Sequence, residues 1–448
     1  MPTCTDEIPS VSRIAPPGPE TWTVFADSAW DPRFGLQRDV RISASDGHIV
    51  ENLHNTSRRR ADVYLPGAIA VPALCNGHDH LKYHWPNRVG GMRFTSSYDW
   101  IPLLQEEAHM SFLRTLPVAD LYWLGALASI SAGVGTVLNH AHNPMILEQR
   151  LLPIRMPNDF RRELMVDLRR NSVIWEHRMG QGAVLESKRA LAEGRPFVVH
   201  IAEGIDVASA NEVASLAHSG ALHEHCILVH AINLSDHEIG LIADAHASVV
   251  WCPASNLYLF GQTAPIMKLL DAGVNVLLGT DSPCSGSESL RDEIRVACDF
   301  LVNQAGLAAE VAAETCIRMA TEAFSEAYPG LGVGSLAVGA SADVLLLSPA
   351  GDHESELVSI AAGSWDVVLL TVGGRGVVLP REWAANGLIP RWFGPTSAVA
   401  RRESEMVIAG DPRDLIERVT AATNISPDML PLFNILFPQN RRYQSTEN

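Results

Sequence analysis

The stretch Asn76-Gly77-His78-Asp79-His80-Leu81 follows an apolar run over residues 65–74, which has the composition of a buried strand. Successive side chains of a strand point to opposite faces, so His78 and His80 point the same way. Two imidazoles on one face can bind a shared ligand. The other strand ends of the chain decide whether that ligand is a metal ion.

Between residues 71 and 334, apolar runs of strand length alternate with patterns of helical period. This alternation predicts βα units and a parallel sheet. The predicted strands include residues 134–138, 197–199, 226–229, 248–251 and 274–278. The chain is long enough for a barrel of about 250 residues, whose strands all open their carboxyl ends onto one mouth. We therefore expect an α/β fold built on a (β/α)8 barrel over residues 71–334.

Polar residues follow most of these runs at the point where each strand is expected to end. Besides His78 and His80 they are His140, His142, His200, Glu203, His230 and Asp281. A single histidine at a strand end is most often a core or rim residue. The coincidence over several strands favours a common site, because three imidazoles and a carboxylate suit a divalent first-row metal ion such as zinc or iron. His78, His80, His200 and Asp281 are the expected ligands.

The two segments that flank this region have a different sequence pattern. Short β-rich pieces with Asp-Pro and Asp-Gly turns occupy residues 21–70, and similar pieces occupy 335–382. Neither flank has enough strands alone, so we expect both to pair into one small composite β-sandwich. Residues 383–448 are expected to form a helical extension with a helix near 412–422. Residues 1–20 lack the pattern of a secretion signal and are expected to form a loose tail.

Composition limits the partners and the compartment. The chain has 448 residues, 47% of them hydrophobic and 19% charged, which fits a globular protein with a large core. Its net charge of −17 repels phosphate backbones and argues against nucleic acid. No apolar run approaches the roughly 18 residues that span a membrane. Seven scattered cysteines without a C-x-x-C pair predict reduced thiols and a cytoplasmic location.

The ordered set of motifs resembles the amidohydrolase superfamily, in particular its mononuclear cytosine-deaminase-like and triazine-hydrolase-like branch. The segments that carry the resemblance are Gly77-His78-Asp79-His80, His200-Ile201-Ala202-Glu203, Val229-His230-Ala231, Trp251-Cys252-Pro253-Ala254-Ser255-Asn256 and Leu278-Gly279-Thr280-Asp281-Ser282. The resemblance covers about residues 60 to 380. It implies a distorted (β/α)8 barrel with a composite β-sandwich, in agreement with the pattern described above.

The resemblance also implies a role for each matching position. His78 and His80 match the first-strand ligands, and His200 and Asp281 match the ligands of the fifth and eighth strands. Glu203 matches the glutamate that shuttles protons, and His230 the histidine that polarises the substrate. No clear lysine on a fourth strand bridges two metals, which favours one ion, zinc first and iron second. Only sixty positions separate His140 from His200, so strands three and four are expected to be short; residues 152–156 and 172–175 are the options.

The chemistry expected of this site is attack by a metal-activated water on a carbon bonded to nitrogen. Asp281 would orient the water and take its proton, His230 would stabilise the developing charge, and Glu203 would deliver a proton to the leaving nitrogen. His140 and His142 are expected to contact the substrate or support a ligand, or to be rim residues without a role. Trp251 and Asn256 are expected to line the pocket or to be packing and turn residues.

Three functions stay open at this point. The first is hydrolytic deamination of an N-heterocycle or amidine in a small-molecule substrate. The second is ring opening of a cyclic amide or imide, and the third is a non-catalytic metal-binding scaffold. The sequence has no G-x-S-x-G elbow of a serine hydrolase and neither of the glycine-rich phosphate-binding motifs. We also expect the chain to form a homo-oligomer.

Overall fold

The structure is a computed structural model that describes most of the chain. The described residues are 21–57, 61–84, 88–90, 93–104, 115–140, 152–157, 160–165, 176–349, 355–391, 396–401, 404–423, 426–427, 430 and 432. Three expectations fall outside these ranges, namely the N-terminal tail over residues 1–20, the position of His142 and the strand option at residues 172–175.

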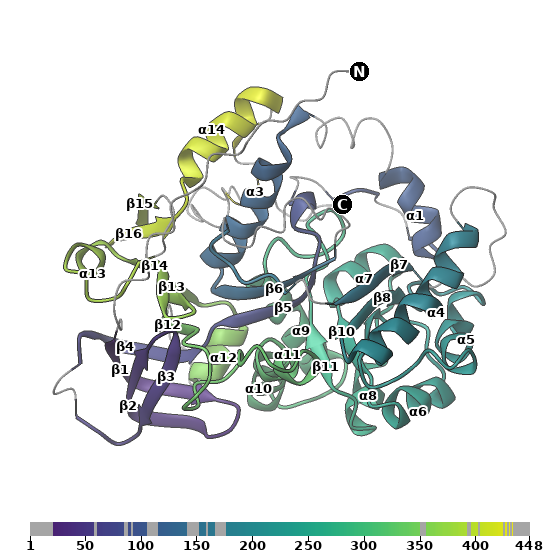
Figure 1. Cartoon of the computed structure of the whole chain (residues 1–448), viewed down its shortest axis with the longest axis horizontal. Coiled ribbons are helices and arrows are strands. Elements are labelled where there is room, and N and C mark those ends of the chain that lie inside the picture. The colour runs from purple at the N-terminus through teal and green to yellow at the C-terminus, as the bar shows by residue number, and fades with distance from the viewer. Residues whose placement is uncertain are drawn as a thin grey trace.

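Strands from both flanks of the chain lie in one nine-stranded sheet, where purple N-terminal strands meet green C-terminal ones (Figure 1). Its order is β15-β16-β14-β13-β12-β4-β1-β2-β3. The flanks meet at the antiparallel pair of β4 and β12, where Val71 lies opposite Leu345. The strands are β1 (Trp22–Asp31), β2 (Gly35–Ser45), β3 (His48–Leu53), β4 (Val63–Pro72), β12 (Val344–Pro349), β13 (Trp365–Val372), β14 (Arg375–Pro380), β15 (Thr396–Arg401) and β16 (Ser404–Ala409).

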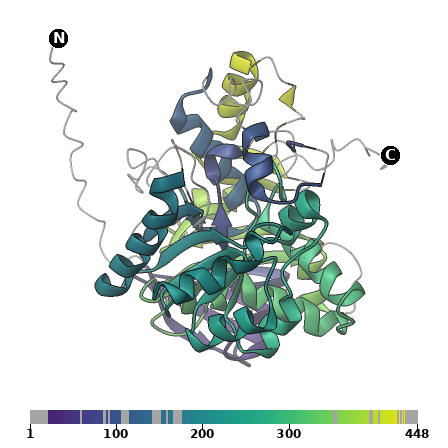
Figure 2. The ribbon, with the colours of Figure 1, turned by 90° about the vertical axis from the view of Figure 1, so that its right-hand side faces the viewer.

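The middle of the chain carries parallel strands, as its alternating pattern predicts. They form a five-stranded sheet of order β11-β10-β9-β8-β7 and a two-stranded sheet of β5 and β6. Figure 2 shows helices packed over this part of the molecule. The strands are β5 (Leu74–Asp79), β6 (Val134–Asn139), β7 (Arg161–Met165), β8 (Phe197–Ile201), β9 (Cys226–His230), β10 (Ser248–Trp251) and β11 (Val276–Leu278).

Two further contacts connect these parallel sheets. Arg155, inside one of the two segments predicted for strands three and four, forms a parallel bridge with Thr136 of β6. The other predicted segment, 172–175, lies outside the described residues, and β7 was not predicted. At the opposite edge, Asp79 and Asp281 form a parallel bridge that joins the ends of β5 and β11. The two edge strands therefore carry the histidine pair and Asp281 to the same place.

Alternation along the parallel strands separates two cores. Val198, Val229, Val250 and Leu277 belong to one apolar cluster, while the residues next to them face a larger cluster that includes the helices. Gly77 lies on the crowded side, because a Cβ there would be 2.9 Å from the Cβ of Leu277. The strands are thus apolar on both faces, as expected of a buried parallel sheet.

An ion pair between the half-buried Arg155 and the buried Asp343 connects the nine-stranded sheet to the parallel strands. The guanidinium of Arg155 contacts the carboxylate of Asp343, and its Nη2 also donates to Ser341 Oγ at 2.9 Å. Nη1 donates to Thr136 Oγ1 at 3.3 Å. We call these four residues the Arg155 junction.

The helices cover the parallel strands and extend the C-terminal end. They are α1 (Ser97–Leu104), α3 (Val118–Ser131), α4 (Glu176–Glu193), α5 (Glu212–His218), α6 (Asp236–Asp244), α7 (Pro253–Phe260), α8 (Ile266–Asp271), α9 (Leu290–Asn303), α10 (Ala309–Met319), α11 (Glu322–Ala327), α12 (Glu356–Ala361), α13 (Arg381–Ala385) and α14 (Pro412–Thr423), with short 3-10 turns at Leu81–Tyr83 and Ser209–Asn211. Within the described ranges, no helix has the length and hydropathy needed to cross a membrane.

The C-terminal region differs from its expectation. It contains the helix predicted near residues 412–422, but it also contains β15 and β16. These strands pair with each other and β16 pairs with β14, where Ile408 lies opposite Val378. The region is therefore not purely helical, because its apolar Met406 and Ile408 extend the nine-stranded sheet.

Candidate metal centre and active site

The end of β5 directs both histidines of the opening motif toward the end of β11. Nε2 of His78 lies 3.7 Å from Asp281 Oδ1, and Nε2 of His80 lies 3.5 Å from the same atom. Backbone bonds hold the two segments together, since His80 N donates to Asp281 O at 2.9 Å and Asp281 N donates to His78 O at 3.1 Å. Both imidazoles therefore face one centre.

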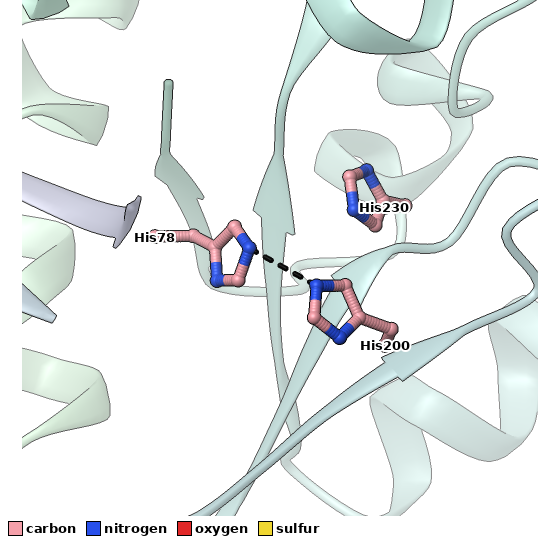
Figure 3. Close-up of side chains that lie close together, drawn as sticks. All are labelled: His78, His200 and His230. Carbon is pink, nitrogen blue, oxygen red and sulfur yellow. Dashed lines mark hydrogen bonds between the residues drawn. The ribbon is translucent and has the colours of Figure 1, made fainter. Parts of the chain in front are cut away.

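His200 near the end of β8, in the five-stranded sheet, faces the same centre. Its Nε2 lies 3.1 Å from Nε2 of His78, as the dashed line in Figure 3 marks. Its ring is stacked 5.5 Å from the ring of His80. The ring of His140 lies 4.6 Å from that of His200, so His140 is a buried member of the same group. We call His78, His80, His140, His200 and His230 the histidine cluster.

The backbone adopts a left-handed conformation where three strands end at this site. The φ angles are 51° at Ala202, 73° at His230 and 62° at Asp281. Residues other than glycine rarely adopt such angles, and those that do are concentrated at functional sites. These turns change the direction of the side chains. By strict alternation His230 would point outward on the same face as Leu228, but the left-handed backbone directs it to the centre.

Glu203 lies beside His230 at the edge of the centre. Its Oε1 is 3.5 Å from His230 Nε2. Its backbone is held by the start of α1, because Ser97 N donates to Glu203 O at 3.0 Å. Gly204 permits this approach, since a Cβ there would lie 2.7 Å from Thr95 O.

His230 is oriented by Asn256 of α7. Nδ1 of His230 donates to Asn256 Oδ1 at 2.9 Å, which turns Nε2 toward His78 and His200 (Figure 3). Among the described residues Nε2 accepts and donates no hydrogen bond. The imidazole is thus held with one nitrogen fixed and the other facing the centre.

Asp281 is fixed by two hydroxyl groups. Ser255 Oγ donates to Asp281 Oδ2 at 2.7 Å, and Ser285 Oγ donates to the same oxygen at 2.6 Å. This leaves Oδ1 for the histidines. Further back, the buried Glu293 of α9 accepts a bond of 2.9 Å from Ala254 N at the start of α7. Glu293 therefore anchors the helix that carries Ser255 and Asn256.

The environment changes the acidity of several of these groups. Burial, followed by the neighbouring imidazoles, holds the pKa of His78 well below its ordinary value. Burial also raises the pKa of Glu203 to about 7; Asp281 adds to this rise and His230 opposes it. A carboxyl group with a pKa near 7 can both release and accept a proton at neutral pH, as an acid–base catalyst requires.

The donor atoms at the centre fit a divalent metal ion. One trio is His78, His200 and His230, and another is His78, His80 and Asp281; within each trio the donor atoms lie within 4.8 Å of one another. Nδ1 of His78 and Nε2 of His230 have no hydrogen-bond partner among the described residues. Neutral imidazoles with a carboxylate are typical ligands of zinc and related ions.

Comparison with known proteins agrees with this arrangement. The model of the amidohydrolase family matches residues 184–377, a range that contains His200, Glu203, His230 and Asp281. Over these residues the chain is similar to the amidohydrolase family. The resemblance predicted from the ordered motifs is confirmed.

The curated relatives of this chain are deaminases by name. A 5-methylthioadenosine/S-adenosylhomocysteine deaminase of Halobacterium salinarum is 37% identical over 171 residues, which are 36% of this chain and 39% of the relative. The chain therefore spans about two fifths of the length of that relative. A protein of the same name from Moorella thermoacetica is 28% identical over 361 residues, covering 68% of this chain and 81% of the relative.

Solved structures share the fold over most of the chain. A zinc-bound adenosine deaminase of Xanthomonas campestris superposes with a TM-score of 0.68 at 19% identity, covering 90% of this chain and 98% of that one. Atrazine chlorohydrolase TrzN of Arthrobacter aurescens with zinc superposes with a TM-score of 0.67 at 17% identity, covering 89% and 99%. At these identities the likeness shows the fold alone.

Neither of the two residues predicted to line the substrate pocket, Trp251 and Asn256, has its polar contact with the centre itself. Trp251 packs against Phe300 of α9, at 5.7 Å between ring centroids, and its Nε1 donates to Thr263 Oγ1 at 2.7 Å. Alternation explains this, because Trp251 shares the outer face of β10 with Val249. Asn256 is near the site, but its Oδ1 holds His230, so it supports another side chain instead of facing the pocket.

Other residues at the site were not predicted from the sequence. Ser285 shows no motif, and its bond to Asp281 depends on a loop whose path only the structure shows. Ser255 lies within a family-like segment, but its role was not foreseen. His84 follows the histidine pair by four positions, and its contact with Asp79 comes from a turn that strand periodicity does not describe.

Proposed function

We propose that this chain is a metal-dependent hydrolase that deaminates the aminopurine ring of an adenine nucleoside or a related N-heterocycle. The observation that carries the proposal is the convergence of His78, His200 and Asp281 beside a buried glutamate. The site supports hydrolysis at a carbon bonded to nitrogen, and the names of the deaminase relatives supply the substrate class.

The same proposal includes the finer architecture. Residues 71–334 form a distorted (β/α)8 barrel, in which Arg155 and β7 represent the third and fourth strands. Residues 21–70 and 335–382 form the composite β-sandwich, and 383–448 form a C-terminal extension. The parallel pairs in chain order and the bridge between Asp79 and Asp281 support the closed barrel.

One divalent ion, zinc first and iron second, is the proposed cofactor. His78, His80, His200 and Asp281 would hold it. The donor atoms of His78, His80 and Asp281 lie within 4.8 Å of one another, and Nε2 of His200 lies 3.1 Å from Nε2 of His78. When bound, the ion would lower the pKa of a water molecule to about 7. Assembly into a homo-oligomer and a cytoplasmic location stay predictions.

The residues of the chain would divide the remaining work. Asp281, fixed by Ser255 and Ser285 through Oδ2, would orient the attacking water and accept its proton. Glu203 would pass a proton to the leaving amino group, since its raised pKa lets it carry one near pH 7. His230, with Nδ1 held by Asn256, would face the substrate with Nε2 and stabilise charge that develops on the ring.

Metal analysis followed by product analysis tests this proposal. The purified protein should contain close to one divalent ion per chain and release ammonia from adenosine, 5-methylthioadenosine or S-adenosylhomocysteine. Turnover of a cyclic amide without ammonia would show ring opening instead. Metal binding without turnover of either substrate class would leave the scaffold as the function.

A further inference from the structure

The chain makes a tight turn over residues 79–84, directly after the histidine pair, and a buried contact joins its two ends. Nε2 of His84 donates to the carboxylate oxygens of Asp79 at 3.1 and 3.2 Å. Both side chains are buried. Nδ1 of His84 has no hydrogen-bond partner among the described residues, so the ring's polar contact within them is the one to Asp79.

Asp79 is in turn tied to the end of β11. Asn76 Nδ2 donates to Asp79 Oδ2 at 3.1 Å and to Thr280 Oγ1 at 2.8 Å. Thr280 N donates back to Asn76 Oδ1 at 3.1 Å. Because Thr280 directly precedes Asp281, this network joins the segments that carry three of the four proposed ligands.

The turn packs closely against helix α3 at Gly125. A Cβ on Gly125 would lie 2.7 Å from Leu81 O and 3.1 Å from Cδ2 of His84, so the turn packs on bare backbone. Leu81 N also donates to Asn139 Oδ1 at 3.1 Å. The turn is thus held from three sides, by Asp79, by α3 and by the end of β6.

The turn carries two side chains beside the centre. The ring of Tyr83 lies 6.0 Å from the ring of His80, and Nζ of Lys82 lies 4.7 Å from the centroid of Tyr83. Movement of the turn would therefore displace His80 together with these two neighbours.

We propose that His84 is a positioning residue for the metal site. By holding Asp79, it fixes the turn so that His80 faces Asp281 and Tyr83 borders the centre. The inference rests on the proposed metal-dependent function, and it adds a residue that none of the predicted ligand or catalytic positions includes.

Zinc affinity of the metal-free protein tests the proposal, measured by competition with a chromogenic chelator at constant pH. His84→Leu removes the donor and should raise the zinc dissociation constant about 10- to 100-fold, the usual effect of losing a group that orients a ligand. His84→Gln keeps an N–H for Asp79 and should stay within a few-fold of the unaltered protein. Gly125→Ala pushes on the turn from α3 and should also weaken zinc binding.

His223 offers a matched control. It is buried to a similar degree, 6% exposed against 5% for His84, and its Nε2 lies 2.9 Å from Ser187 Oγ, in another part of the fold. His223→Leu should lower the melting temperature of the metal-free protein and leave the zinc dissociation constant unchanged. This control separates general destabilisation from an effect on the metal site.

Each outcome has a defined meaning. Zinc binding by His84→Leu equal to that of the unaltered protein would overturn the proposal, even if the melting temperature falls. If His84→Leu does not fold, unchanged zinc binding in both Asp79→Asn and Gly125→Ala would overturn it. Absence of zinc binding in the unaltered protein would instead refute the proposed function.

Discussion

The Arg155 junction and the histidine cluster are both buried and polar, and they differ in how their charges are satisfied. In the junction, a guanidinium meets a carboxylate, and Thr136 and Ser341 take up other donors. Burial alone would lower the pKa of Arg155, but Asp343 more than offsets it and the pKa lies above its ordinary value. The junction therefore needs no further partner.

The histidine cluster has the opposite balance. Several imidazoles face one another around the carboxylate of Asp281, with Glu203 at the edge of the cluster. The pKa of His78 is held well below its ordinary value, first by burial and then by the other rings. His78 therefore favours its neutral form, whose lone pair suits a cation. A buried polar group whose hydrogen-bond and charge partners all come from the chain therefore belongs to the folded scaffold. A cluster of buried polar groups that lacks such partners indicates a ligand site.

Loss of the acid–base residue should have the largest effect. Glu203→Gln keeps the shape of the side chain but removes its ability to carry a proton, so kcat should fall roughly 100- to 10,000-fold. Metal content should stay that of the unaltered protein. Glu238→Gln is the control, because this buried glutamate forms the capping box of α6 and should leave kcat unchanged. An active, metal-loaded Glu203→Gln would remove Glu203 from this role.

Breaking the junction should destabilise the fold without changing the metal site. Asp343→Ala leaves the guanidinium of Arg155 without its carboxylate, and the free energy of unfolding should fall by about 3–5 kcal/mol. Urea unfolding measures this loss, and metal titration of the folded variant should still give one site. Loss of metal binding at unchanged stability would contradict the division between the two regions.

Glu293 should give a smaller, pH-dependent effect. Burial raises its pKa to about 8, from an ordinary value near 4.5; bonds from Ser287 and Ala254 oppose this rise, as does Arg88, while Asp281 adds to it. The folded state therefore holds a proton that the unfolded state releases. The contribution is fully present below pH 4.5 and is lost as the pH rises to about 8.

Glu293→Gln tests this dependence because it removes the titration and keeps an oxygen for Ala254 N. Urea unfolding of the metal-free protein between pH 5 and pH 8 should show a smaller decline of stability for the variant. Equal slopes for both proteins would show that Glu293 does not hold the extra proton.

The sequence predicts the parallel strands well because both faces of each are apolar and polar residues mark their ends. His78, His80, His200 and Asp281 are found together because the carboxyl ends of such strands share one edge. Strand β7 is missed because it begins with three charged residues, Arg161, Arg162 and Glu163, and so lacks an apolar strand pattern. Trp251 does not line the pocket because it is the last residue of β10 and its side chain still follows strand alternation.

Residues outside the strands that contact the site residues cannot be predicted from sequence patterns. Ser285 and His84 reach the site through turns, and turns have no periodicity that fixes the direction of a side chain. The left-handed backbone at His230 and Asp281 also breaks the alternation on which a prediction depends. The third and fourth strands are difficult for a related reason, because Arg155 pairs through an isolated bridge and not a full strand.

The metal site is tested most directly by titrating zinc into the metal-free protein and measuring binding and melting by calorimetry. We expect one ion per chain, a rise in melting temperature on binding, and loss of both effects in His78→Ala, since His78 belongs to both donor trios. Binding that persists in His78→Ala, or no binding by the unaltered protein, would contradict this expectation.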